Sequence, residues 1–230
     1  MKRFWSFCFA ILFLFTAFRP YQEAIAAPVT DNPQEDYLIM NGKLWRNLYL
    51  GIKGNPYFMT GEFLNGDITF NGRVFRDRIF KYDTYNDEIV LWINTGTTII
   101  LNKEMVSEFN INYLGEKYHI VNLGEDTTSI ISGYVNVYYA GPTPLYVKYR
   151  KEIEILAVDN RYDLFIDLHR SYIKKDGQIL QVSGKGELLK ILSDRKDDVK
   201  HYIKTNKLRV TKKEPRSFIP VLEYYDKLRQ

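Results

Sequence analysis

The sequence predicts a mainly β fold of the α+β type, built as an antiparallel sheet, a sandwich or an open barrel of hairpins with a C-terminal helical tail. Three observations lead to this prediction. Short apolar runs alternate with polar residues at a period of two, which is typical of strands with one buried face. Turns that contain glycine separate these runs. After about residue 184 the apolar period becomes that of an α-helix.

Residues 1–26 have the three parts of a secretory signal peptide. Two basic residues follow Met1, an apolar run covers residues 4–18, and small residues lead up to Ala26. The apolar run is shorter than the ~20 residues that span a bilayer. We therefore expect cleavage after Ala26 and export to the periplasm or the cell surface. Residues 27–183 are then expected to form a β-rich domain, and residues 184–230 a helical tail packed on it.

Asn-Gly and Asp-Gly pairs predict hairpins within the β-rich domain. The pairs at 41–42 and 71–72 occupy the same place in a short repeat, and a third pair stands at 176–177. Both central residues of a type I′ turn need positive φ, which Asn and Asp tolerate and Gly adopts freely. The repeat thus predicts one hairpin unit used twice. A short helix is expected to interrupt the strands at residues 103–109.

Later strands show clear alternation, over residues 134–139, 145–154 and 164–169. In the second of these, apolar residues point to one side and charged residues such as Lys148 and Arg150 to the other. This pattern predicts a strand whose charged face is turned to solvent.

The tail carries three apolar stripes at helical spacing. Helices as short as these are marginal alone, so we expect them to dock on the β-rich domain through the stripes. The stripes are Leu188, Leu189 and Leu192; Val199, Tyr202 and Ile203; and Phe218, Val221, Leu222, Tyr225 and Leu228.

Composition excludes some chemistry and divides the chain by charge. The one cysteine, Cys8, lies in the predicted signal peptide, so the mature chain has no disulfide, cysteine nucleophile or Cys-ligated zinc. Residues 27–169 carry 13 Lys and Arg against 19 Asp and Glu, whereas residues 170–230 carry 16 against 8. The basic tail either packs beside the acidic body with solvated lysines or meets an anionic partner.

The densest acidic cluster, at residues 81–88, contains a candidate metal site. Asp83, Asp87 and Glu88 could converge on calcium, which takes six to eight oxygen ligands. The alternative is a solvated turn between two strands. Asp167 and His169 share a strand face and could ligate zinc, but nothing in the sequence brings a third ligand to them.

Other candidate chemistry is sparse. Asn94 stands where an aspartic-protease loop needs Asp, and there is no Gly-x-Ser-x-Gly elbow. The 18 Tyr, 14 Phe and 3 Trp either stack on sugar rings at an exposed sheet face or fill cross-strand pairs. Thr127, in Asp-Thr-Thr, matches an O-glycosylation acceptor pattern of some Gram-negative bacteria.

Three segments together carry a resemblance that covers most of the mature chain. They are residues 66–72, residues 82–88 and the tail from 188 to 225. In these segments the chain resembles a family of uncharacterised exported bacterial proteins. The resemblance implies a single exported β-rich domain with a helical tail and implies no activity, ligand or catalytic residue.

Taken together, these features predict an exported, non-catalytic binding or interaction protein of the bacterial cell envelope that needs no cofactor. The expected partners are an envelope protein, a glycan or an anionic lipid, and not nucleic acid, and the mature chain has no predicted transmembrane segment. Two alternatives remain open. One is a hydrolase that uses dispersed carboxylates such as Asp83, Asp87 or Asp167. The other is a structural subunit of an envelope assembly, marked by an exposed apolar patch.

Overall fold

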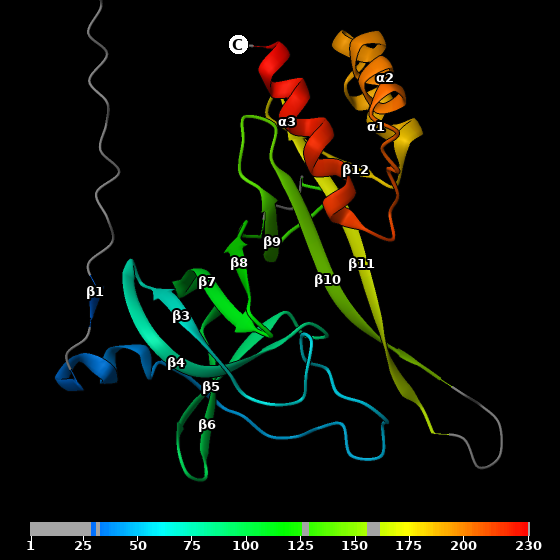
Figure 1. The fold of residues 1–230 in the computed structure, drawn as a ribbon. Helices are drawn as coiled ribbons and strands as arrows, with labels where there is room; N and C mark the ends of the chain where they lie inside the picture. Colours follow the sequence, from blue (N-terminus) through cyan, green and yellow to red (C-terminus); the bar gives the residue numbers. More distant parts are fainter. Residues whose placement is uncertain (1–28, 31–32, 126–128, 156–161, 230) are drawn as a thin grey trace, which may run out of the picture.

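Within the residues that the structure describes, twelve strands form one open sheet with a helical tail at its C-terminal end, which confirms the predicted mainly β fold (Figure 1). This computed structural model describes residues 29–30, 33–125, 129–155 and 162–229. The predicted signal peptide of residues 1–26 and the candidate acceptor Thr127 lie outside the described residues.

The strand order is β12-β11-β10-β9-β8-β7-β3-β4-β5-β6-β2, with β1 paired to β4 off this path. The β1–β4 pair is parallel and the pairs along the path are antiparallel. The path begins at β12 and ends at β2, so the sheet does not close into a barrel. The strands are β1 Val29–Thr30, β2 Gly42–Leu44, β3 Leu64–Phe70, β4 Arg73–Asp83, β5 Glu88–Asn94, β6 Thr97–Leu101, β7 Val106–Tyr113, β8 Glu116–Asn122, β9 Tyr134–Tyr139, β10 Leu145–Glu154, β11 Leu164–Lys175 and β12 Gln178–Val182.

Three short α-helices follow the last strand and lie at one end of the sheet, beside β12 and the neighbouring end of β10 (Figure 1). Within the described residues, none of the helices is long and apolar enough to cross a membrane. The α-helices are α1 Lys185–Ile191, α2 Lys196–Thr205 and α3 Ile219–Leu228, and the 3-10 helices are η1 Pro33–Ile39, η2 Lys103–Met105, η3 Ser193–Arg195 and η4 Pro215–Phe218.

Two of the three predicted hairpin turns are confirmed. The pair at 71–72 joins β3 to β4, with φ of 48° at Asn71 and 74° at Gly72. The pair at 176–177 joins β11 to β12, with φ of 48° and 81°. In each pair both residues have the positive φ that a type I′ turn needs.

The hairpin predicted at 41–42 is wrong, and so is the idea of one hairpin unit used twice. Gly42 instead begins the short edge strand β2 and stands opposite Leu101 of β6. A Cβ added to Gly42 would lie 2.1 Å from the carbonyl oxygen of Ile100. Glycine is therefore used here to let two backbones approach closely, and not to make a turn.

The short helix predicted at residues 103–109 is also wrong beyond its first turn. Asn102 caps the 3-10 helix η2 by accepting a hydrogen bond from the backbone N–H of Glu104. From Val106 onward the chain forms β7, which pairs with β3 on one side and β8 on the other. Hydrogen bonding of β7 to a strand on each side outweighs the helical conformation expected from the local sequence.

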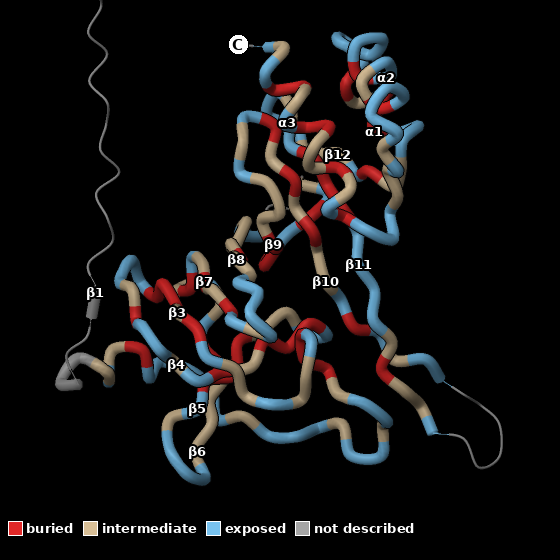
Figure 2. The backbone as a smooth tube through the Cα atoms, viewed as in Figure 1, coloured by how far each residue is buried: buried red, intermediate tan, exposed pale blue. Residues whose placement is uncertain are grey.

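Two main apolar clusters hold the molecule together, one in each half of the sheet (Figure 2). The first gathers buried side chains of β3, β4, β5, β7 and their neighbours, among them Phe75, Phe80 and Phe109. The second joins Leu145 of β10 and Ile173 of β11 to the helical tail. Its helical members include Leu188, Leu189, Leu192, Val199, Ile203, Phe218, Val221, Leu222 and Tyr225, all from the predicted stripes.

Candidate functional site

A cleft of about 400 Å³ lies where the two halves of the sheet meet. We call it the Asp87 cleft. Its walls are the turn between β4 and β5, the start of η2, the segment before β9, and one face of the β10–β11 hairpin. The lining residues are Thr84, Tyr85, Asn86, Asp87, Lys103, Ile130, Ile131, Ser132, Lys148, Arg150, Glu152, Leu168, His169, Arg170 and Tyr172.

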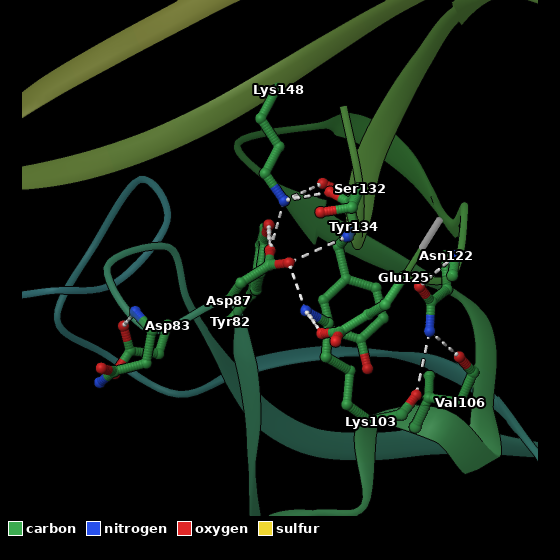
Figure 3. Close-up of polar contacts among 12 residues, drawn as sticks. Tyr82, Asp83, Asp87, Lys103, Val106, Asn122, Glu125, Ser132, Tyr134 and Lys148 are labelled. Carbon is green, nitrogen blue, oxygen red and sulfur yellow. Dashed lines mark hydrogen bonds and ion pairs between the residues drawn. The ribbon is translucent and has the colours of Figure 1, made fainter. Parts of the chain in front are cut away.

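Asp87 is the centre of the polar network in this cleft (Figure 3). One carboxylate oxygen, Oδ1, accepts from the Tyr82 hydroxyl at 2.7 Å and pairs with Lys148 Nζ at 2.8 Å. The other, Oδ2, pairs with Lys103 Nζ at 2.9 Å and accepts from the backbone N–H of Tyr134 at 3.2 Å. Burial opposes ionisation of Asp87, but its interactions with Lys148, Tyr82 and Lys103 outweigh burial and lower the pKa of the carboxyl.

Both lysines have further partners. The Lys148 ammonium also donates to the carbonyls of Ser132 at 3.1 Å and Tyr134 at 2.9 Å, so its three N–H groups are all used. Burial lowers the pKa of Lys148, against the opposing effect of Asp87. Lys103 reaches the exposed carboxylate of Glu125 at 3.4 Å. The network therefore links four separate segments of the chain through one carboxylate.

Two backbone positions make room for this network. Asp87 itself has φ of 60°, the left-handed conformation that aspartate tolerates better than most residues. Gly133 has φ of 67°, and a Cβ placed there would lie 1.9 Å from Asp87 Oδ2 and 2.8 Å from Lys103 Nζ. A side chain at 133 would therefore push directly into the ion pair.

The three candidate calcium ligands point to different partners. The Asp83 carboxylate is buried and accepts from the backbone N–H groups of Tyr85 and Asn86, both at 2.9 Å, and from the Asn86 side chain at 3.0 Å. Figure 3 shows Asp83 well apart from the Asp87 network. Burial raises the pKa of Glu88, which lines a second hollow. Among the described residues, no group of three or more His, Cys, Asp and Glu is placed to hold a metal ion.

The candidate zinc ligands are also held by other groups. Asp167 pairs with Lys151 at 2.9 Å, and His169 Nε2 lies 2.9 Å from the backbone carbonyl oxygen of Lys212. His119 lies beside Asn110, with 3.1 Å between its Nδ1 and the amide oxygen. Within the described part of the chain, these side chains therefore do not form a zinc-binding group.

Two arginines are the accessible cations of the cleft. Arg150 and Arg170 are both exposed, and the Arg150 partner Glu152 is 4.0 Å away. In the β10–β11 register Arg150 faces Leu168, and Arg170 stands two positions further along β11 and opposite Lys148. The two arginines are thus diagonal neighbours on one sheet face, and both line the cleft. Four cationic side chains and two carboxylates line the cleft, which leaves a net positive lining.

A second hollow, of about 760 Å³, adjoins the Asp87 cleft because both are lined by Asn86 and Lys103. It extends toward the edge strand β2 and is lined by four asparagines as well as charged residues. The two hollows are neighbours that share the Asn86 and Lys103 side chains as part of their walls. The lining asparagines are Asn41, Asn86, Asn102 and Asn122.

Sequence reasoning identified Asp87 but missed Lys103 and Lys148. The alternation in β10 predicted a solvated face for Lys148, whereas its side chain is only 19% exposed. The prediction was wrong because it treated β10 as having solvent on that face, where the turn of residues 84–87 and the segment before β9 cover it. Nothing local marks Lys148 as a partner of a carboxylate 61 residues earlier in the chain.

Compared with known proteins, the chain matches no protein family, no curated protein and no solved structure.

Proposed function

We propose that this protein is an exported, non-catalytic binding protein of the bacterial cell envelope, and that the Asp87 cleft holds an anionic group of its ligand. The group is a phosphate or carboxylate of an acidic glycan or an anionic lipid. The observation that carries the proposal is the pair of exposed arginines, Arg150 and Arg170, above an ion-pair network that is already satisfied.

Hydrogen-bond capacity supports binding over catalysis. Asp87 accepts four interactions and Lys148 donates three, so neither has a free position from which to move a proton. Arginine guanidinium groups remain charged at any physiological pH and match the geometry of carboxylates and phosphates. The buried network thus holds the walls in place, and the arginines face the ligand.

The carboxylate hydrolase is less well supported. Of the three carboxylates considered for it, Asp87 lines the cleft, whereas Asp83 is held by its own turn and Asp167 pairs with Lys151. Glycoside hydrolysis needs one carboxyl with a raised pKa as proton donor. The pKa of Asp87 is lowered, and Asp83, whose pKa is raised by burial, does not line the cleft.

Binding to three anionic probes tests the proposal. Purified protein is titrated with inorganic phosphate, with a uronic acid disaccharide and with vesicles containing phosphatidylglycerol. The double variant Arg150→Ala/Arg170→Ala is expected to lose at least tenfold in affinity for the probe that binds, because each charge-assisted hydrogen bond contributes about 1.5–3 kcal/mol. Comparison of the soluble and vesicle probes identifies the source of the anionic group.

A matched control separates a site from general charge attraction. Lys190→Ala/Lys200→Ala removes the same charge from exposed positions of the helical tail. We expect this control to bind as the wild type does. An equal loss in both double variants, or no binding of any probe, contradicts the proposal.

A second candidate function is a subunit of an envelope assembly, because β2 and the segment after it expose three leucines. Leu44, Leu48 and Leu50 are 61%, 78% and 83% exposed. Together with the edge of β2 that pairs with no other described strand, they offer a partner both apolar contact and backbone pairing. Cross-linking in the native cell, compared between the wild type and Leu48→Asp, tests this candidate: a cross-linked partner that disappears in the variant supports it.

A further inference from the structure

A further hollow, also of about 400 Å³ and separate from the two described above, lies on the face of β10 opposite the Asp87 cleft. We call it the tyrosine slot. Tyr149 lines it, whereas the adjacent residues Lys148 and Arg150 line the cleft, as strand alternation requires. The residues lining the slot are Glu116, Tyr118, Tyr138, Tyr149, His169, Lys213, Glu214, Pro215 and Arg216.

Three tyrosines from three adjacent strands form the floor of the slot. Tyr118 lies on β8, Tyr138 on β9 and Tyr149 on β10. Buried Phe58 contacts the rings of Tyr118 and Tyr149 in edge-to-face geometry, with centroid distances of 5.1 and 4.9 Å. These contacts hold the rings in place, so the floor is organised before any ligand arrives.

The hydroxyls of the slot retain hydrogen-bonding capacity. The Tyr138 and Tyr149 hydroxyls bond to each other, and only one of the two hydrogens is used in that bond. Within the described parts of the chain, the Tyr118 hydroxyl has no hydrogen-bond partner. The slot therefore offers both apolar ring surface and free O–H groups.

The charged groups around the slot balance one another. Arg216 forms an ion pair with Glu116, with 3.3 Å between Nη1 and Oε1, and its guanidinium lies 5.9 Å from the Tyr138 ring centroid. Lys213 and Glu214 add one charge of each sign. The lining thus has two acidic and two basic side chains, with no net charge to attract a charged ligand.

From this combination we infer that the tyrosine slot binds the ring of a neutral sugar. A sugar ring has apolar C–H faces that stack on aromatic side chains and hydroxyls at its edge that bond to polar groups. A purely apolar ligand would bury the charges of the Glu116–Arg216 ion pair and leave the Tyr118 hydroxyl without a partner, which is costly. This inference does not depend on the anionic ligand proposed for the Asp87 cleft.

Titration with neutral trisaccharides tests the inference. The probes are trisaccharides of glucose and of N-acetylglucosamine, and binding is followed by saturation-transfer NMR and by tyrosine fluorescence. We expect at least one probe to bind, and Tyr118→Ala to weaken that binding about tenfold, as the loss of one stacking ring predicts. Arg216→Ala removes an exposed side chain at the rim and is expected to weaken it by several-fold with the fold intact.

Tyr224→Ala is the matched control, since it removes a tyrosine that stacks on Tyr202 in the helical tail and does not line the slot. It is expected to leave sugar binding unchanged. Failure of every neutral probe to bind overturns the inference. So does binding that survives both Tyr118→Ala and Arg216→Ala, or binding that is lost in Arg150→Ala/Arg170→Ala while the slot variants retain it.

Discussion

At the scale of single residues, Asp87 has the largest structural role of the carboxylates in the cleft. It is one acid between two lysines that come from η2 and β10, and its side chain is 18% exposed. Removing one partner from a partly buried ion pair leaves the other charges without compensation. The stability of the cleft therefore depends strongly on this position.

Asp87→Asn is expected to lower the free energy of unfolding by about 3 kcal/mol, because it removes the carboxylate that pairs with Lys148 and leaves Lys103 with the exposed Glu125 at 3.4 Å. Urea unfolding followed by circular dichroism measures the change. Asp77→Asn is the control, since Asp77 also has positive φ (51°) but is exposed. If the unfolding free energy of Asp87→Asn falls by less than about 1 kcal/mol, the ion pairs of Asp87 contribute little to stability.

The difference in unfolding free energy between the wild type and Asp87→Asn is predicted to depend on pH. The folded-state pKa of Asp87 lies below its ordinary value of 3.8, so ionisation of Asp87 stabilises the fold above that pH. This stabilisation is lost as pH falls below 3.8 through the folded-state pKa. The difference in unfolding free energy between wild type and Asp87→Asn should therefore shrink as unfolding is repeated from pH 7 down to pH 2.5. A difference that stays constant over this range contradicts the assignment.

Gly133→Ala tests how tightly the backbone surrounds the network. The added methyl group meets Asp87 Oδ2, and the left-handed φ adds strain. We expect a loss of about 3 kcal/mol, made up of 1–2 kcal/mol of backbone strain and the weakened ion pair. Gly177→Ala has a similar φ of 81° with open space around the new Cβ, so it should show the strain alone. Equal losses in the two variants, measured by urea unfolding, would exclude the steric contribution.

At the scale of elements, turn chemistry explains which features were predictable. The pairs at 71–72 and 176–177 satisfy a local demand for positive φ, and the helical stripes in the tail follow from spacing alone. Gly42 and residues 106–109 were predicted wrongly because their conformation depends on strands distant in sequence. The partners of Asp87 were missed for the same reason, since an ion pair between distant elements leaves no local pattern.

The docking of α3 on the β9–β10 connection gives a prediction at this scale. Asp226 is buried and accepts from the Tyr139 hydroxyl at 2.8 Å, from the Thr143 backbone N–H at 3.1 Å and from the Thr143 hydroxyl at 2.5 Å. Asp226→Ala leaves these donors unpaired and is expected to lower the unfolding free energy by about 2–3 kcal/mol. Glu223→Ala, exposed on the same helix, should have little effect. Limited proteolysis of the tail and urea unfolding measure both.

At the scale of the whole molecule, the two apolar clusters are held in one sheet but share no residue. We expect a destabilising substitution in one cluster to affect local unfolding of that cluster more than of the other. Leu222→Ala removes a fully buried side chain from the tail cluster and should cost about 2–5 kcal/mol. Hydrogen exchange read by mass spectrometry should then rise in α1, α2, α3 and β12 more than in β3, β4 and β5. A uniform rise in hydrogen exchange over all strands and helices would mean that the molecule unfolds as one unit. Leu114→Ala, at an 85% exposed site, serves as the control.

Strand β10 contributes neighbouring side chains to two different sites. Lys148 and Arg150 line the Asp87 cleft, and Tyr149 lines the tyrosine slot. All three are fixed to one short length of backbone, so a ligand-induced shift of that backbone would move the linings of both hollows. Coupling of this kind would obey thermodynamic reciprocity: each occupant would change the affinity for the other by the same free energy.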